Sequence, residues 1–91
     1  MNSRKLIWTK GFSKDIKRAK RRNQNLESLQ KIIEMLQSGN TLSQEYKPHP
    51  LKGKYSDYME CHIEPDWLLI WKTDSKNVYL TRTGTHSDLF G

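Results

Sequence analysis

The three histidines of this chain each lie in a short and distinctive segment. His49 lies in His-Pro-Leu-Lys-Gly, His62 in Glu-Cys-His-Ile, and His86 in Thr-Gly-Thr-His-Ser-Asp-Leu-Phe near the carboxyl terminus. Histidine exchanges protons near neutral pH because its unperturbed pKa is about 6.5. In a chain of 91 residues with a formal net charge of +6, three such groups favour acid–base chemistry on a polyanion.

The positive charge is concentrated near the amino terminus. Residues 1–25 hold nine of the 16 Lys and Arg residues and only Asp15 of the 10 acidic ones. Six basic residues fall within nine positions: Lys14, Lys17, Arg18, Lys20, Arg21 and Arg22. They form either a solvated helix face or a surface that binds RNA phosphates, and the pI of 9.6 favours the second interpretation. A membrane-surface role is disfavoured, since no stripe of aromatic or leucine residues accompanies the charges.

The length predicts one domain that spans residues 1–91. Cys61 is the only cysteine, which excludes an internal disulfide and fits a reducing cytoplasm. We find no apolar stretch that resembles a secretory signal or a membrane span. We therefore expect a cytoplasmic protein with no membrane partner.

The first half of the chain predicts a strand and two helices. Leu6-Ile7-Trp8 is a short apolar run, and Phe12, Ile16 and Ala19 follow at helical spacing. Asn25 is suited to begin a second helix, whose apolar positions run from Leu26 to Leu36, and Gly39 is suited to end it. These elements indicate a helical hairpin with an apolar stripe.

The second half predicts a loop and then strands. Residues 38–57 contain two prolines and two glycines as well as His49, and they are expected to be irregular. Strands are expected at 59–63, 67–71 and 78–81, with turns at Pro65-Asp66 and at 74–77. The order β-αα-βββ predicts an α+β domain with the helices packed on a mostly antiparallel sheet.

Alternation along the first of these strands separates its side chains onto two faces. Met59, Cys61 and Ile63 are expected on the core side, so Glu60 and His62 project together from the other face. Uninterrupted alternation would place Arg82 on the same face of the sheet as Val78 and Leu80, whereas a bulge would move it to the other face. The sequence does not decide between these two positions.

Four segments together resemble YafQ-type toxins of the RelE superfamily: residues 48–53, 60–63, 66–70 and 82–90. With the size, the basic helices and the element order, the resemblance covers essentially the whole chain. It implies a RelE-like fold and a ribosome-dependent endoribonuclease, the toxin of a type II toxin–antitoxin system. Such toxins cut mRNA in the ribosomal A site without a metal.

The resemblance also implies which residues form the active site. The family's positions fall here on His49, Glu60, His62, Asp66, His86 and Phe90. Two residues depart from the pattern. Glu60 stands where aspartate is common, which lengthens the reach of the carboxylate, and Met59 stands where arginine is frequent, which we expect to affect packing.

Metal-free RNA cleavage needs a base for the ribose 2′-hydroxyl, an acid for the leaving 5′-oxygen, and positive charge near the phosphorus. We expect His86 to be the general acid. We expect His62, steered by Asp66 or Glu60, to be the base or its close partner. His49, with Lys52 and Arg82 as weaker candidates, would hold the phosphate, while Phe90 would stack on a base.

Each of these residues also has a purely structural interpretation. Asp66 could serve only the turn, Arg82 a structural ion pair, and Phe90 the attachment of the chain end. Zinc or another metal is disfavoured because the sequence has no His-x-His, no Cys-x-x-Cys and no helical histidine pair, so we expect no cofactor. The alternative to an enzyme is a noncatalytic basic module that binds RNA, the ribosome or an antitoxin.

The resemblance predicts two partners. One is the ribosome with its mRNA. The other is a cognate antitoxin, which we expect to be small, acidic and partly disordered, because such a segment can wrap a basic surface and fold as it binds.

Overall fold

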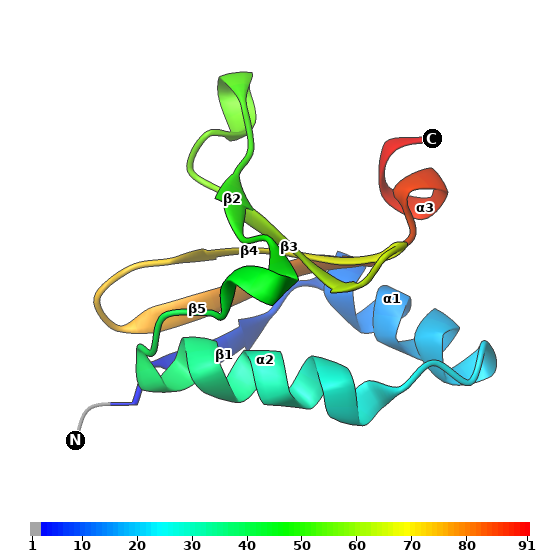
Figure 1. Cartoon of the computed structure of the whole chain (residues 1–91), viewed down its shortest axis with the longest axis horizontal. Helices are drawn as coiled ribbons and strands as arrows, with labels where there is room; N and C mark the ends of the chain where they lie inside the picture. Colours follow the sequence, from blue (N-terminus) through cyan, green and yellow to red (C-terminus); the bar gives the residue numbers. More distant parts are fainter. Residues whose placement is uncertain (1–2) are drawn as a thin grey trace.

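The computed structural model describes residues 3–91, in which two helices cover one face of a five-stranded sheet (Figure 1). The elements are β1 (Lys5–Trp8), α1 (Lys10–Arg21), α2 (Leu26–Ser38), the 3-10 turn η1 (Gln44–Tyr46), β2 (His49–Pro50), the 3-10 turn η2 (Gly53–Tyr55), β3 (Met59–Glu64), β4 (Trp67–Thr73), β5 (Asn77–Gly84) and α3 (His86–Phe90). The predicted α+β fold is confirmed. Within residues 3–91, no helix has the length and apolar composition needed to cross a membrane.

The sheet is mostly antiparallel, with the strand order β1-β5-β4-β3-β2. Only β1 runs parallel to its neighbour, β5, among the strands described. The β3–β4 and β4–β5 hairpins occur where the sequence predicted them. The short strand β2 was not predicted, since the sequence suggested that the whole of 38–57 is irregular.

Local signals set the ends of the two long helices. The Thr9 side chain accepts a hydrogen bond from the Phe12 amide at the start of α1. Asn25 begins α2 as predicted, with its side chain accepting from the amides of Glu27 and Ser28. Gly39 ends α2 at a φ of 82°, a left-handed conformation that glycine adopts without strain.

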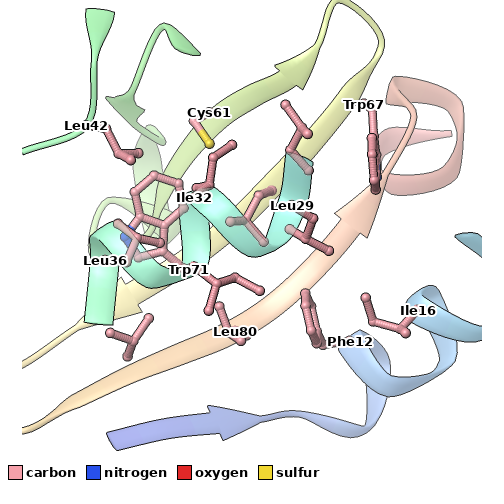
Figure 2. Close-up of a cluster of buried hydrophobic side chains, with 14 of the residues drawn as sticks. Phe12, Ile16, Leu29, Ile32, Leu36, Leu42, Cys61, Trp67, Trp71 and Leu80 are labelled. Atoms are coloured by element: carbon pink, nitrogen blue, oxygen red, sulfur yellow. The ribbon is translucent and has the colours of Figure 1, made fainter. Parts of the chain in front are cut away.

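The core lies between the helices and the sheet (Figure 2). Phe12 and Ile32, one from each helix, are 0% exposed, and they meet the sheet residues Leu69, Trp71 and Leu80 in one cluster. Cys61 belongs to this cluster, and burial raises the pKa of its thiol to about 12, so it stays a thiol at neutral pH. Cys61 is thus a core residue.

The two faces of the sheet have different roles. On β3, Cys61 and Ile63 are buried and Met59 packs partly buried against the same core, as the alternation predicted. Glu60 and His62 therefore lie on the opposite face. That face carries the loop around β2 and η2 at one side and α3 at the other (Figure 1). The predicted functional residues of β3 thus face these two segments.

A β-bulge in β5 decides the position of Arg82. Ile70 pairs with Arg82 and Trp71 with Leu80, so Thr81 is an extra residue in β5. Such a bulge re-aims the side chains that follow it. Arg82 is thereby moved away from the core face of Val78 and Leu80, and it lines the opposite face beside Ile70.

Truncation of the α2 core side chain should unfold the protein more easily. We expect Ile32→Ala to lower the free energy of unfolding by about 2–5 kcal/mol, because it removes a fully buried side chain and leaves a cavity. Urea denaturation measures this change. The matched control is the exposed neighbour Lys31→Ala, for which we expect a change within about 0.5 kcal/mol. Equal effects would contradict the described core.

Candidate active site

The short strand β2 brings His49 beside Glu60, its register partner on β3. His49 Nε2 lies 3.1 Å from Glu60 Oε1, and His49 Nδ1 lies 2.8 Å from the Lys47 carbonyl oxygen. Both ring nitrogens face oxygen acceptors, so both bonds form together only when the ring is protonated. Glu60 is 6% exposed, and its Oε2 makes no hydrogen bond to any described residue. The nearly buried carboxylate of Glu60 thus orients the His49 ring.

His62 lies between the other two histidines. Its ring centroid is 6.4 Å from that of His49 and 5.9 Å from that of His86. His62 Nδ1 lies 3.2 Å from the Pro65 carbonyl oxygen, an acceptor that requires a proton on Nδ1. In the neutral ring, Nε2 then keeps its lone pair and can accept a proton.

His86 is held by Asp66, which lies in the turn between β3 and β4. Asp66 Oδ1 accepts from the His86 amide at 3.0 Å and lies 2.7 Å from His86 Nδ1. These backbone and side-chain hydrogen bonds lower the pKa of Asp66. The carboxylate is thus ionised at neutral pH, and it fixes the orientation of the His86 ring. Both side chains are more than half exposed, so the site is open to a large substrate.

The carboxylates pair differently from the sequence-based expectation. Asp66 or Glu60 was expected to steer His62, whereas the structure pairs Asp66 with His86 and Glu60 with His49. The reason is geometric. The β2–β3 register sets Glu60 opposite His49, and the Asp66 turn lies under the start of α3. His62 receives a neutral carbonyl partner instead.

Arg82 contacts a buried carboxylate on α1. Its Nε lies 2.6 Å from Oδ2 of Asp15, which is 2% exposed. The same carboxylate accepts from Arg18 Nη2 at 2.9 Å and from the Thr83 amide at 3.0 Å. Arg82 therefore forms a structural ion pair, which was one of its two interpretations from the sequence. This ion pair occupies the guanidinium that was also considered for phosphate binding.

A second carboxylate extends this cluster to α3. Asp88 accepts two hydrogen bonds from Arg22, at 2.7 and 3.1 Å, and lies 3.5 Å from Arg18 Nε. It also forms a capping box with Thr85 at the start of α3. Two of the six basic residues expected to bind RNA, Arg18 and Arg22, thus hold the helix that carries His86.

Asp15 and Asp88 were missed as site-supporting residues. The spacing Thr85-x-x-Asp88 is a capping-box pattern and could have indicated Asp88. Asp15 is the single acidic residue among the nine basic ones of residues 1–25, which is a weaker signal.

The other predicted binding residues are solvent-exposed. Four basic residues are exposed on α1 and make no ion pair with any residue in 3–91: Lys14, Lys17, Lys20 and Arg21. Lys52 is exposed between β2 and η2. Phe90, 59% exposed on α3, lines a hollow of about 260 Å³ with residues of η2 and of the sheet. These positions remain compatible with RNA binding.

The donor set does not fit a resident metal ion. Among residues 3–91, no three His, Cys, Asp or Glu side chains are grouped so that they could hold one. His49 and His86 each direct a ring nitrogen at a carboxylate, and the His62 Nδ1 is directed at a carbonyl.

Comparison with known proteins supplies the family. The family described as "Bacterial toxin of type II toxin-antitoxin system, YafQ" matches residues 4–91. The mRNA interferase toxin YafQ of Escherichia coli K12 is 40% identical, with 100% of both chains covered. This chain belongs to the YafQ family. The resemblance read from the sequence and the expectation of an endoribonuclease toxin are confirmed.

Solved structures of bacterial toxins share the fold. The crystal structure of the E. coli DinJ-YafQ toxin-antitoxin complex matches with a TM-score of 0.91 and 38% identity, over 98% of this chain and 99% of that chain. A metal-bound toxin from Helicobacter pylori matches with a TM-score of 0.88 and 36% identity, over 94% of this chain and 98% of that chain. The metal is a property of that toxin, whereas the described side chains of this one group no three such donors.

The Asp88 contacts should make stability depend on pH. The hydrogen bonds from Arg22 and Thr85 lower the pKa of Asp88 below its usual range. Its stabilising contribution is thus complete above the unfolded-state pKa of about 3.9 and is lost as the pH falls further. We expect Asp88→Asn to cost about 1 kcal/mol at pH 7, since Arg22 is partly exposed, and progressively less as the pH falls from 4 to 2.

Thermal or urea denaturation between pH 7 and pH 2 measures this difference. The control is Asp57→Asn, which removes an exposed carboxylate outside the ion cluster. A cost of Asp88→Asn that stays constant over this pH range would contradict the contribution of its ion pairs.

Proposed function

We propose that this YafQ-family toxin cleaves mRNA in the ribosomal A site by metal-free acid–base catalysis. The observation that carries the proposal is the row of three histidines, each held by a different kind of partner. His49 has an oxygen acceptor at each ring nitrogen, Nε2 of a neutral His62 keeps its lone pair, and His86 Nδ1 faces the Asp66 carboxylate. We assign to them, in this order, the cation, the base and the acid that ribose-assisted cleavage requires.

The cleavage step moves one proton at each end of the reaction. Nε2 of His62 accepts the proton of a ribose 2′-hydroxyl, and this oxygen attacks the adjacent phosphorus. The bond from phosphorus to the 5′-oxygen breaks, and protonated His86 gives that oxygen a proton. The products are a 2′,3′-cyclic phosphate and a 5′-hydroxyl. The assignment is supported by the Pro65 carbonyl on His62 and the Asp66 carboxylate on His86.

His49 and Phe90 position the scissile nucleotide. A protonated His49 places positive charge next to His62, where negative charge develops on the phosphoryl oxygens. Glu60 is the buried carboxylate that keeps His49 oriented. The exposed ring of Phe90 follows His86 on α3 and is available to stack on a base.

Ribosome dependence follows from how little this domain offers to orient its substrate. The catalytic side chains are exposed on one face of a small sheet, with His49 at 46% and His86 at 56% side-chain exposure. Correct orientation supplies a large part of many rate enhancements. We infer that the ribosome provides it, and that the exposed basic residues of α1 bind ribosomal RNA phosphates.

The partners follow from the same proposal. We infer that a cognate antitoxin, acidic and partly disordered, covers the basic surface. This is supported by the structural relative, a toxin solved in complex with DinJ. We infer a cytoplasmic location from the same proposal, because translated mRNA is found there.

Loss of the proposed general acid should slow cleavage strongly. We expect His86→Ala to lower the single-turnover rate on ribosome-bound mRNA by about 10²–10⁴-fold, the range for one positioned proton-transfer group. Ribosome affinity should stay unchanged, since one imidazole adds little to binding by Lys and Arg. The control is Ser87→Ala, the exposed neighbour on α3. EDTA at a Mg²⁺ level that keeps ribosomes intact should leave the wild-type rate unchanged.

Full activity of His86→Ala would show that the acid is another group. Loss of wild-type activity in EDTA with intact ribosomes would overturn the metal-free mechanism. Equal rates of the wild-type protein on free and ribosome-bound mRNA would overturn ribosome dependence.

Charge reversal on α1 should weaken ribosome binding without unfolding the protein. We expect Lys14→Glu, Lys17→Glu and Arg21→Glu together to lower the affinity for the ribosome. The slope of log affinity against log salt concentration should become shallower by about 0.7–0.9 for each lost phosphate contact. Arg18 and Arg22 are left intact because they hold α3. The matched control reverses Lys5, Lys31 and Lys76, which are exposed on other elements. Identical salt slopes for the two triple variants would show that the basic face of α1 is only solvated and does not bind phosphates.

A further inference from the structure

We propose that the hollow between η2 and α3 is a base-binding pocket, in which one unpaired nucleobase of the cleaved strand stacks on Tyr55, whose ring Tyr58 supports edge to face. The inference rests on the proposed function and extends it, because neither tyrosine has a part in the proton transfers. The hollow has a volume of about 260 Å³. Its lining residues are Leu51, Tyr55, Tyr58, Ile70, Thr81, Arg82, Leu89 and Phe90.

The pocket is continuous with the row of histidines. Ile70 pairs across the sheet with Glu60 on one side and with Arg82 on the other. Glu60 in turn pairs with His49. Residues opposite each other on neighbouring strands lie about 5 Å apart, so the pocket begins one strand away from the carboxylate that holds His49. A nucleotide whose phosphate lies at the histidines therefore has this pocket within reach of its own base or of a neighbouring one.

The two walls of the pocket belong to the segments that carry the histidines. Leu51 and Tyr55 follow β2, which carries His49, while Leu89 and Phe90 share α3 with His86. Figure 1 shows these two segments rising from the same face of the sheet. Binding in the pocket and alignment of the catalytic groups are thus geometrically coupled.

Exposed aromatic rings concentrate at this place. In the described part of the chain, the large hydrophobic residues that are exposed are Trp8, Tyr55 and Phe90, and two of these three line the pocket. The Tyr55 and Tyr58 rings lie edge to face with centroids 6.3 Å apart. An aromatic face held in solvent is what base stacking uses, and it accepts any base because each has a π-face.

Two lysines lie beside the tyrosine rings. Lys54 Nζ lies 5.2 Å from the Tyr55 ring centroid, and Lys72 Nζ lies 5.3 Å from the Tyr58 centroid. Flat apolar surfaces with cations beside them match the chemistry of a nucleotide, whose base is flat and whose phosphates are anionic. The volume lies below the range of about 300–1,000 Å³ typical of sites for larger ligands, which suits a single base.

The test uses ribosomes programmed with an mRNA that carries 2-aminopurine at one position of the A-site codon. Methylation of the 2′-hydroxyls of that codon prevents cleavage, so fluorescence reports stacking alone. We expect the wild-type protein and Tyr55→Phe to quench the fluorescence at one codon position. Tyr55→Ala, Tyr55→Leu and Tyr58→Ala should lose the quenching.

Cleavage of unmodified mRNA provides the second readout. We expect Tyr55→Ala to lower kcat/KM by about 10-fold or more, the usual effect of one lost stacking contact, and to relax the preference at the quenched codon position. Tyr55→Phe should keep both. The matched control is Trp8→Ala, an exposed aromatic at the other end of the sheet, which should behave as wild type. Thermal melts confirm that each variant is folded.

The outcomes separate this inference from the proposed function. If the wild-type protein quenches but does not cleave ribosome-bound mRNA, the pocket is supported and the proposed function fails. If the wild-type protein cleaves and the folded tyrosine variants quench and cleave equally well, the pocket is wrong. If those variants keep cleavage and lose only antitoxin binding, the hollow is a protein-docking site and the inference is overturned.

Discussion

The buried carboxylate of Asp15 is the interaction on which the site depends. Asp15 is 2% exposed and accepts hydrogen bonds from Arg18, Arg82 and the Thr83 amide. A buried charge is tolerated only with such partners, and removal of one partner from a buried pair costs about 3–5 kcal/mol. Through these bonds α1 is joined to β5 at the point where that strand turns into the segment leading to His86.

This cluster divides the basic residues into two groups with different physical tasks. Arg18 and Arg22 lie on α1 next to residues that remain free for phosphates, yet they bind Asp15 and Asp88. A run of positive charge in the sequence is therefore not a uniform binding surface. Part of it neutralises the two carboxylates that hold β5 and α3 against α1, and His86 is oriented as a consequence.

The sequence predicts those features that depend on local pattern. Helical spacing of Phe12 and Ile16, the Asn25 cap and the alternation around Cys61 all specify local structure, and each is confirmed. The sequence did not predict three other features: the pairing of His49 with Glu60, the bulge at Thr81 and the contact between Asp15 and Arg82. Each depends on register or on residues far apart in the chain, and a shift of one residue would reverse the face of every side chain involved.

The three histidines differ in the kind of partner that each one contacts. A carbonyl oxygen accepts a hydrogen bond but carries no net charge, so Pro65 fixes the tautomer of His62 and nothing more. A carboxylate also places negative charge beside the ring, and His86 and His49 each contact one. The ring centroids of His49 and His62 lie 6.4 Å apart, and those of His62 and His86 lie 5.9 Å apart. Because the residue type is the same at all three positions, it is the backbone turn at Pro65-Asp66 and the β2–β3 register that give each histidine its own partner.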